Sequence, residues 1–178
     1  MKEINVFEYL PLIMTELGKG ILLNTKNGDS TNTMTIGWGQ VGIEWGKVFF
    51  TAYVRHGRFT HKLIEENKEF TISIPLDRTA ELSKAIGFCG YNTGKNCDKI
   101  KEAGLTAING QKVNSPAIKE LPLTLECKVI YQQEQDETKI PKEEFEKFYP
   151  QNIPSDNPRA NRDMHTVYYG EIINAYIL

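Results

Sequence analysis

The sequence has no long hydrophobic run and no excess of charge of either sign. None of its apolar runs approaches the roughly 20 residues that a helix needs to cross a bilayer. The formal net charge is −2 over 178 residues, which gives no indication of a basic surface for nucleic acid or an anionic membrane. We therefore expect neither nucleic acid nor a membrane among its partners.

Cysteine is scarce. There are three, Cys89, Cys97 and Cys127, an odd number without CxxC or zinc-like spacing. This usage favours free thiols in a reducing compartment over disulfides. The N-terminal segment carries Glu3 and Glu8 and has no small-residue cleavage pattern, so it does not resemble a secretory signal. We expect a cytoplasmic protein.

Several catalytic and metal-binding motifs are missing. There is no GxSxG elbow and no Rossmann GxGxxG. The segment GFCGYNTGKNCDK (87–99) fails as a P-loop, because Cys89 stands where glycine is required and Asn96 where Ser or Thr is required. His56 and His61 are five residues apart and share no helical face, so we expect no metal site. The sequence supports no nucleophilic hydrolase and indicates no catalytic side chain.

What the sequence does contain is typical of one globular, mostly β domain over residues 1–178. Hydrophobic residues make up 40% and charged residues 25% of the chain. Short aromatic and β-branched runs between turn residues predict strands, at 21–26, 31–40, 48–54, 70–75, 123–133 and 165–178. Periodicity and capping residues predict short helices, within 58–70, 79–87, 98–103 and 141–154. The last helix lies in an insertion at about 136–158.

The segment TNTMTIGWGQ (31–40) raises a specific question. Strand alternation would place two sets of side chains on opposite faces: Met34, Ile36 and Trp38 on one, Thr33 and Thr35 on the other. Gly37 and Gly39 flank the tryptophan, and glycine inside a strand marks a bulge or a close approach by a ligand or another backbone. From these residues alone, a core tryptophan between ordinary strand-forming residues is the more common arrangement. A flat ligand is the alternative.

Two further stretches concentrate polar groups. Arg55 and Arg58 leave a strand beside a helix start for which Thr60 is the expected N-cap, an arrangement suited to an anion but also common as a surface arginine pair. After the helix at 79–87 we expect a glycine-rich loop, in which Thr93, Gly94 and Lys95 offer backbone N–H groups and one cation. Alone, that stretch is more often a plain loop. His165 in the last strand is most often a structural histidine.

Together these stretches resemble the flavin reductase-like family of FMN-binding split β-barrels, in particular its flavoredoxin-type branch. The resemblance covers about 10–135 and 160–178, with the insertion as the least familiar part. It rests on the order and spacing of short motifs: Asn32-Thr33-Met34-Thr35 with Trp38-Gly39, residues 54–60, Thr93-Gly94-Lys95 with Asp98-Lys99, Leu125-Glu126-Cys127, and residues 165–171. It implies a six-stranded split barrel and a homodimer with flavin near the subunit interface.

The resemblance also implies a set of cofactor-binding residues. The segment Asn32 to Thr35, including Thr33 and Met34, would lie along the flavin ring with Trp38. The other implied contacts are Arg55, Arg58 and Thr60 at the phosphate or ribityl chain, Thr93, Gly94 and Lys95 over the polar end, and His165 and Tyr169 from the last strand. The family often has serine where Gly57 stands, so position 57 is not implied as a contact.

The implied function is that of an FMN-binding oxidoreductase. Bound FMN, with FAD as the less expected flavin, would take hydride from NADH or NADPH and pass electrons to an acceptor. One alternative is a flavoredoxin-like electron carrier supplied by a redox protein partner. Another is a flavin-binding module without turnover, because fold does not fix function. The sequence leaves the donor and the acceptor open.

Overall fold

A computed structural model describes residues 1–154 and 161–178. Its main element is an antiparallel sheet of eight strands in the order β3-β2-β6-β9-β10-β5-β4, with β1 paired to β10. The strands are β1 (Lys2–Glu3), β2 (Ile21–Asn27), β3 (Ser30–Ile36), β4 (Gly39–Glu44), β5 (Lys47–Arg55), β6 (Glu69–Ile74), β9 (Leu123–Glu134) and β10 (His165–Ile177). A separate two-stranded sheet pairs β7 (Ala107–Ile108) with β8 (Ala117–Ile118). The expected mostly β fold is confirmed.

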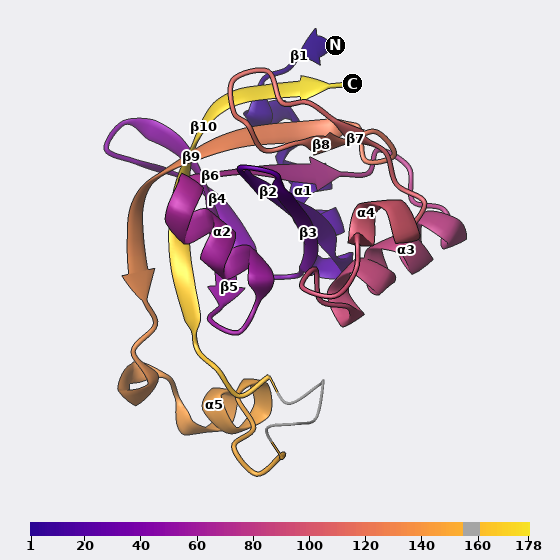
Figure 1. Ribbon diagram of the computed structural model, residues 1–178. Helices are drawn as coiled ribbons and strands as arrows, with labels where there is room; N and C mark the ends of the chain where they lie inside the picture. Colours follow the sequence, from indigo (N-terminus) through magenta and orange to yellow (C-terminus); the bar gives the residue numbers. More distant parts are fainter. Residues whose placement is uncertain (155–160) are drawn as a thin grey trace.

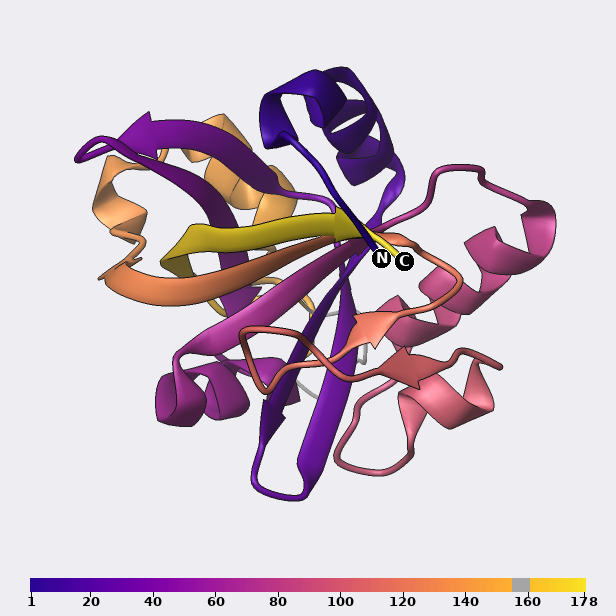
Figure 2. The ribbon, with the colours of Figure 1, turned by 90° about the horizontal axis from the view of Figure 1, so that it is seen from above.

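The main sheet has eight strands instead of the expected six, for two reasons. The two-residue β1 adds to β10, and the segment 31–40, expected as one strand, divides into β3 and β4. Gly37 and Trp38 form the connection between them. Because β3 and β4 stand at opposite ends of the strand order, this connection links the two edges of the curled sheet (Figure 2). Trp38 therefore lies at a corner and not inside a strand.

The turn residues Asn27, Gly28 and Asp29 predict a hairpin after residue 26, and the structure confirms it. Asn27 pairs with Ser30, which leaves Gly28 and Asp29 as the loop. Gly28 has φ +55°, in the left-handed region that glycine adopts without steric cost.

The core lies between the strands and is closed at one end by α1 (Leu10–Lys19). Phe50, Phe70 and Tyr168 are its largest fully buried rings, and Ile13 and Leu17 reach it from α1. A smaller apolar cluster packs α3 (Ala80–Tyr91) and α4 (Lys99–Glu102) around Leu22. None of the helices in the described ranges is both long and apolar enough to span a membrane.

Two helix predictions need correction. The helix expected within 58–70 is α2 (Phe59–Asn67), and its N-cap is Arg58, not Thr60. Thr60 is instead buried in the first turn, where its hydroxyl accepts a hydrogen bond from Asn32 Nδ2 at 2.6 Å. Residues 88–91, expected to be loop, form the last turn of α3, and Gly90 lets this turn pack closely against Thr35.

The insertion lies between β9 and β10, and Figure 1 shows it below the sheet, opposite the two chain termini. It contains a 3-10 turn (η2, Glu137–Lys139) and α5 (Lys142–Phe148). A further 3-10 turn (η1, Val6–Tyr9) precedes α1. The predicted surface helix in 141–154 is confirmed over the span of α5, with Pro141 at its N-cap. Part of the expected insertion, residues 155–158, lies outside the described residues.

Candidate functional site

Two adjoining cavities lie where β3, the β5–α2 turn and the base of the insertion meet. The first, here called the Trp38 cavity, has a volume of about 170 Å³ and is lined by Met34, Thr35, Ile36, Gly37, Trp38, Tyr53, Arg55, Arg58, Asn161 and His165. The second, here called the Lys99 cavity, has a volume of about 80 Å³. Its principal polar lining residues are Asn32, Arg58, Thr60, Thr93 and Lys99. The cavities share Met34, Thr35 and Arg58, so they form one elongated recess.

Gly37 and Gly39 differ in what surrounds them. A Cβ on Gly39 would lie 2.8 Å from the Phe50 ring and 3.1 Å from the Thr51 carbonyl oxygen. The packing of β5 therefore explains Gly39. A Cβ on Gly37 would meet only the Leu17 carbonyl oxygen at 3.8 Å, and Gly37 lines the Trp38 cavity. Of these two glycines, only Gly37 leaves its backbone open to a ligand.

Trp38 forms the aromatic wall of its cavity. Its ring centroid lies 5.0 Å from that of His165 and 5.2 Å from that of Phe148, the last residue of α5. The side chain remains 38% exposed, so it is not the core residue that strand alternation would make it. The insertion thus supplies part of the surroundings of Trp38.

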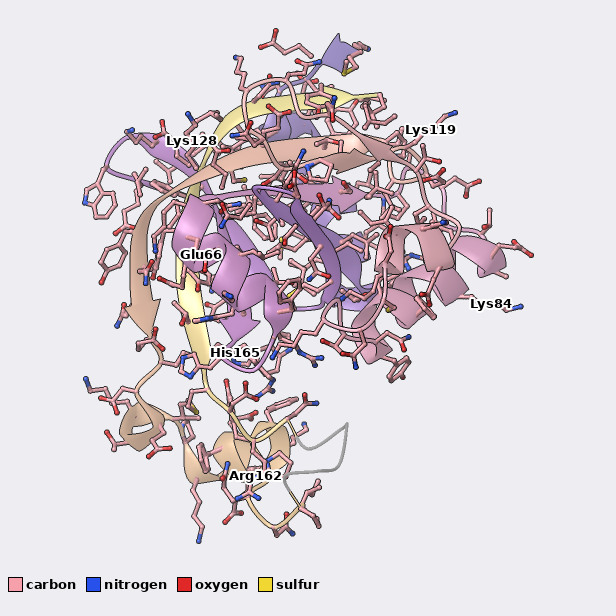
Figure 3. The ribbon with its side chains drawn as sticks, in the orientation of Figure 1. Glu66, Lys84, Lys119, Lys128, Arg162 and His165 are labelled. Carbon is pink, nitrogen blue, oxygen red and sulfur yellow. The ribbon has the colours of Figure 1, made fainter. Side chains whose placement is uncertain are left out.

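His165 is buried at the first position of β10 (Figure 3). Its Nδ1 lies 2.8 Å from the Tyr149 hydroxyl and 3.1 Å from Gln135 Oε1. Burial, and next the nearby Arg55 charge, lower the pKa of His165 to about 3. The imidazole is therefore neutral at physiological pH, a form suited to hydrogen bonding without adding charge to the cavity.

The guanidinium of Arg55 is not free for a ligand, because it donates hydrogen bonds to the chain segment between β9 and β10. Its Nη1 donates to the carbonyl oxygens of Asn161 and Asp163 at 3.0 and 2.6 Å, and its Nη2 to that of Phe148 at 3.0 Å. The guanidinium also lies 4.8 Å from the Tyr149 ring centroid. Arg55 therefore lines the Trp38 cavity, while most of its donors are engaged by the insertion.

The 92–98 loop closes on the Lys99 cavity at Gly94. A Cβ there would lie 2.0 Å from Asn32 Oδ1 and 3.1 Å from the Phe59 ring. A larger residue at position 94 would displace the buried Asn32 side chain, which donates a hydrogen bond to Thr60. Thr93 and Gly94 thus line the same cavity as Asn32 and Thr60.

Lys99 lines the site but is not among the cofactor-binding residues that the resemblance implied. Its side chain is buried, its Nζ donates to the Cys89 carbonyl oxygen at 3.0 Å, and it lines the same cavity as Arg58. Among the described residues, no carboxylate pairs with it. Burial lowers the pKa of Lys99 to about 8, and the Arg58 charge acts in the same direction. A buried ammonium without a counter-ion marks a place for an anion.

Three residues of the predicted set do not line either cavity. Thr33 is buried on the opposite face of β3, where its hydroxyl donates to Asn24 Oδ1 at 2.7 Å. Lys95 is exposed on the 92–98 loop. Tyr169 packs against Phe49 and Tyr131, with ring centroids 6.5 and 5.1 Å away. The hydrogen bond to Asn24 on the neighbouring strand keeps the Thr33 side chain away from the cavities.

The chain also matches a known protein family. Residues 14–178 match the flavin reductase like domain. The chain belongs to the flavin reductase-like family. This flavin reductase-like chain is 32% identical over 128 residues to an uncharacterized protein of Archaeoglobus fulgidus, covering 71% of the chain and 66% of that relative. It is 32% identical over 108 residues to a Pyrococcus abyssi protein, covering 61% of the chain and 59% of that relative. The chain thus spans 66% and 59% of the lengths of these two relatives, less than two thirds of each.

Solved structures show the same fold. Flavoredoxin of Desulfovibrio vulgaris (Miyazaki F) superposes with a TM-score of 0.65 at 24% identity, over 89% of this chain and 69% of that one. An FMN-binding domain of a flavin reductases-like enzyme from Shewanella baltica OS155 superposes with a TM-score of 0.66 at 15% identity, over 99% and 78%. A flavin reductase with a split barrel domain from Shewanella frigidimarina has a TM-score of 0.65 at 16% identity, over 89% and 66%. The predicted split barrel is confirmed.

Proposed function

We propose that this chain binds FMN along the joined Trp38 and Lys99 cavities and transfers electrons through it. The observation that carries the proposal is the buried ammonium of Lys99, which lacks a carboxylate partner within the described ranges and shares its cavity with Arg58. A phosphate monoester would neutralise both cations through charge-assisted hydrogen bonds. The hydroxyls of Thr60 and Thr93 line the same cavity.

The size of the Lys99 cavity favours FMN over FAD. Its volume of about 80 Å³ suits one terminal phosphate, and the approach of Gly94 to Asn32 closes the loop side of the cavity. In FAD the corresponding phosphate continues into a second phosphate and an adenosine, which would need an exit through that loop.

The Trp38 cavity offers the surface for a flat ring. Met34 supplies an apolar side chain, Gly37 an open stretch of backbone, and Trp38 an aromatic wall. Neutral His165 faces the same cavity and can form one hydrogen bond there without charge. When bound, flavin supplies the hydride and electron chemistry. The chain's own residues bind it, orient it and limit its contact with water.

NADH or NADPH is the proposed electron donor. Because the sequence lacks a Rossmann fingerprint, the nucleotide would dock transiently on the exposed side of the flavin, next to Trp38. A flavoredoxin-like carrier supplied by a redox protein partner is the second candidate. Phe148, the last residue of α5, packs against Trp38 and accepts a hydrogen bond from Arg55. These contacts favour the carrier, since they restrict the access of a nucleotide to this side of the Trp38 cavity.

A homodimer is the proposed assembly. Large apolar side chains are exposed on the β4–β5 hairpin and on β9: Ile43, Trp45, Ile130 and Tyr131 are 68%, 62%, 44% and 41% exposed. Trp45 contacts Tyr131, which in turn contacts Tyr169. A continuous aromatic surface of this kind supports a protein interface, and Tyr169 would lie beside the proposed subunit contact. Light scattering that gives a monomer mass would contradict this assembly.

The test is a visible absorption spectrum of the protein with FMN, repeated without oxygen after NADH and then NADPH are added. A bound-flavin spectrum that bleaches with either nucleotide supports the reductase and identifies its donor. A bound spectrum that bleaches only with a reduced redox protein supports the carrier. Absence of any bound spectrum overturns the cofactor assignment. Riboflavin, which lacks the phosphate, is the matched control ligand.

A further inference from the structure

Three metal-ligating side chains meet outside the two cavities. His56 lies in the β5–α2 turn, His61 in α2 and Glu134 at the end of β9. One ligand atom from each lies within 4.8 Å of the other two. As expected, the two histidines share no helical face, since His56 precedes α2, but the turn brings its ring centroid to 5.2 Å from that of His61.

The surroundings orient two of these ligands. The Thr166 hydroxyl donates to Glu134 Oε1 at 2.6 Å, so it has no proton left for His61, whose Nε2 lies 2.9 Å from the same oxygen. His61 Nε2 must therefore carry a proton and donate it to Thr166. Its Nδ1 then carries the lone pair, and no donor among the described residues occupies it. Metal-binding histidines commonly have this arrangement, with the second ring nitrogen donating to a fixed acceptor.

The third ligand is free to adjust. His56 Nε2 lies 2.5 Å from Glu134 Oε2, and the two side chains are 45% and 59% exposed. Two ligands on one tetrahedral zinc ion lie roughly 3–3.5 Å apart, given bonds of about 2 Å. Rotation of the exposed His56 side chain can provide that separation while Glu134 keeps its hydrogen bond from Thr166.

We propose that His56, His61 and Glu134 form a binding site for a divalent transition-metal ion of the zinc class. Two imidazoles and one carboxylate are the ligands that such ions prefer, whereas Mg²⁺ and Ca²⁺ take oxygen ligands. Three protein ligands leave a coordination position open to solvent.

The location gives the ion a structural consequence. Glu134 stands where the chain leaves β9 for the insertion, and His56 is next to Arg55, which binds the insertion's carbonyl oxygens. A bound ion would join the β5–α2 turn to the base of the insertion. This inference is independent of flavin binding.

The experiment uses the full chain without a histidine tag and measures Zn²⁺ binding by isothermal titration calorimetry, with Co²⁺ absorption as a second readout. We expect one ion per chain, a raised Tm with added Zn²⁺, and no effect of Mg²⁺. H56Q and E134Q should each lower the affinity at least tenfold, and T166V by roughly 10–100-fold through the loss of orientation.

The matched control is E144Q, which removes an exposed carboxylate from α5 and should leave Zn²⁺ binding unchanged. H56Q and E134Q alter exposed side chains, and circular dichroism checks that both variants fold. Absence of Zn²⁺ binding to the parent chain, or equal binding to the parent, H56Q and E134Q, overturns the proposal. Intact Zn²⁺ binding by protein that fails to bind FMN would leave the metal site standing and remove only the flavin assignment.

Discussion

The ammonium of Lys99 donates a hydrogen bond to the carbonyl oxygen of Cys89 at 3.0 Å. This contact joins the first residue of α4 to the last turn of α3 and holds the lysine at the wall of the cavity that Arg58 also lines. Lys99 is buried, and among the described residues its ammonium has a neutral carbonyl and no carboxylate as its partner. This state is costly unless an anion accompanies it.

Replacing Lys99 by methionine should weaken FMN binding at least tenfold, because a charge-assisted hydrogen bond to phosphate contributes about 1.5–3 kcal/mol. Riboflavin binding should stay unchanged. Quenching of flavin fluorescence measures both affinities. The matched control is K95M, which removes the exposed cation that the resemblance implied as a cofactor contact. A larger loss in K95M than in K99M would place the phosphate under the loop instead of in the Lys99 cavity.

FMN affinity should fall as the pH rises through about 8, the pKa to which burial lowers Lys99. Above that pH the free protein has lost the proton, and binding the phosphate must restore it. Each pH unit then costs up to about tenfold in affinity until the pKa of the complex is reached. The same titration with K99M protein, or with riboflavin, should lack this decline. A decline that persists in K99M would assign it to another group.

Replacing Arg55 by glutamine should release the insertion. The change removes three hydrogen bonds to carbonyl oxygens of Phe148, Asn161 and Asp163, so we expect a loss of about 3 kcal/mol in the free energy of unfolding. Limited proteolysis should then cut first within 136–154. The control R58Q removes one longer contact, to Asn161 Oδ1 at 3.3 Å, and should keep the insertion protected. Equal cleavage of both variants would refute an anchoring role.

The two glycines beside Trp38 make a matched pair. G39A should lower the free energy of unfolding by about 1–3 kcal/mol, because its methyl group would overlap the Phe50 ring. G37A should leave stability within about 0.5 kcal/mol, yet weaken FMN binding if the ring lies against this backbone. Urea denaturation and flavin titration measure the two effects. Unchanged FMN affinity in G37A would show that the ring lies elsewhere.

Stability should decline as the pH falls below about 6.5. His165 keeps a pKa of about 3 in the folded chain, whereas an unfolded histidine titrates near 6.5. Between those values the unfolded state binds more protons, so the free energy of unfolding drops by up to about 1.4 kcal/mol per pH unit. The measurement is denaturant unfolding from pH 7 to pH 4.5, compared with H165Q. Parallel curves for parent and variant would exclude His165 as the source.

The order of strands and helices was largely predictable, because it depends on local patterns. Asn27-Gly28-Asp29 specified a hairpin, Pro75 directly followed the end of β6, and Gly104 with φ +69° followed α4. The division of 31–40 was not predictable from alternation. The packing of Phe50 against Gly39 is contributed by a strand that comes later in the sequence.

The site was predictable in part for the same reason. Asn32, Thr60, Thr93 and Gly94 do meet, but nothing in the local sequence distinguishes buried Lys99 from exposed Lys95. That difference depends on how α4 packs against α3. The involvement of Arg55 with the insertion likewise depends on residues about a hundred positions later.

The base of the insertion is closed by the sheet itself. Glu134 pairs with Thr166, and the Gln135 N–H donates to the His165 carbonyl oxygen at 3.1 Å. Because strand pairing fixes both ends of the segment, the entropy cost of closing it depends only logarithmically on its length. Phe148 and Tyr149 nevertheless bring aromatic rings to Trp38. The insertion can therefore vary independently of the barrel. Its replacement would change the side chains that pack against Trp38, while the strand pairing of the barrel stays the same.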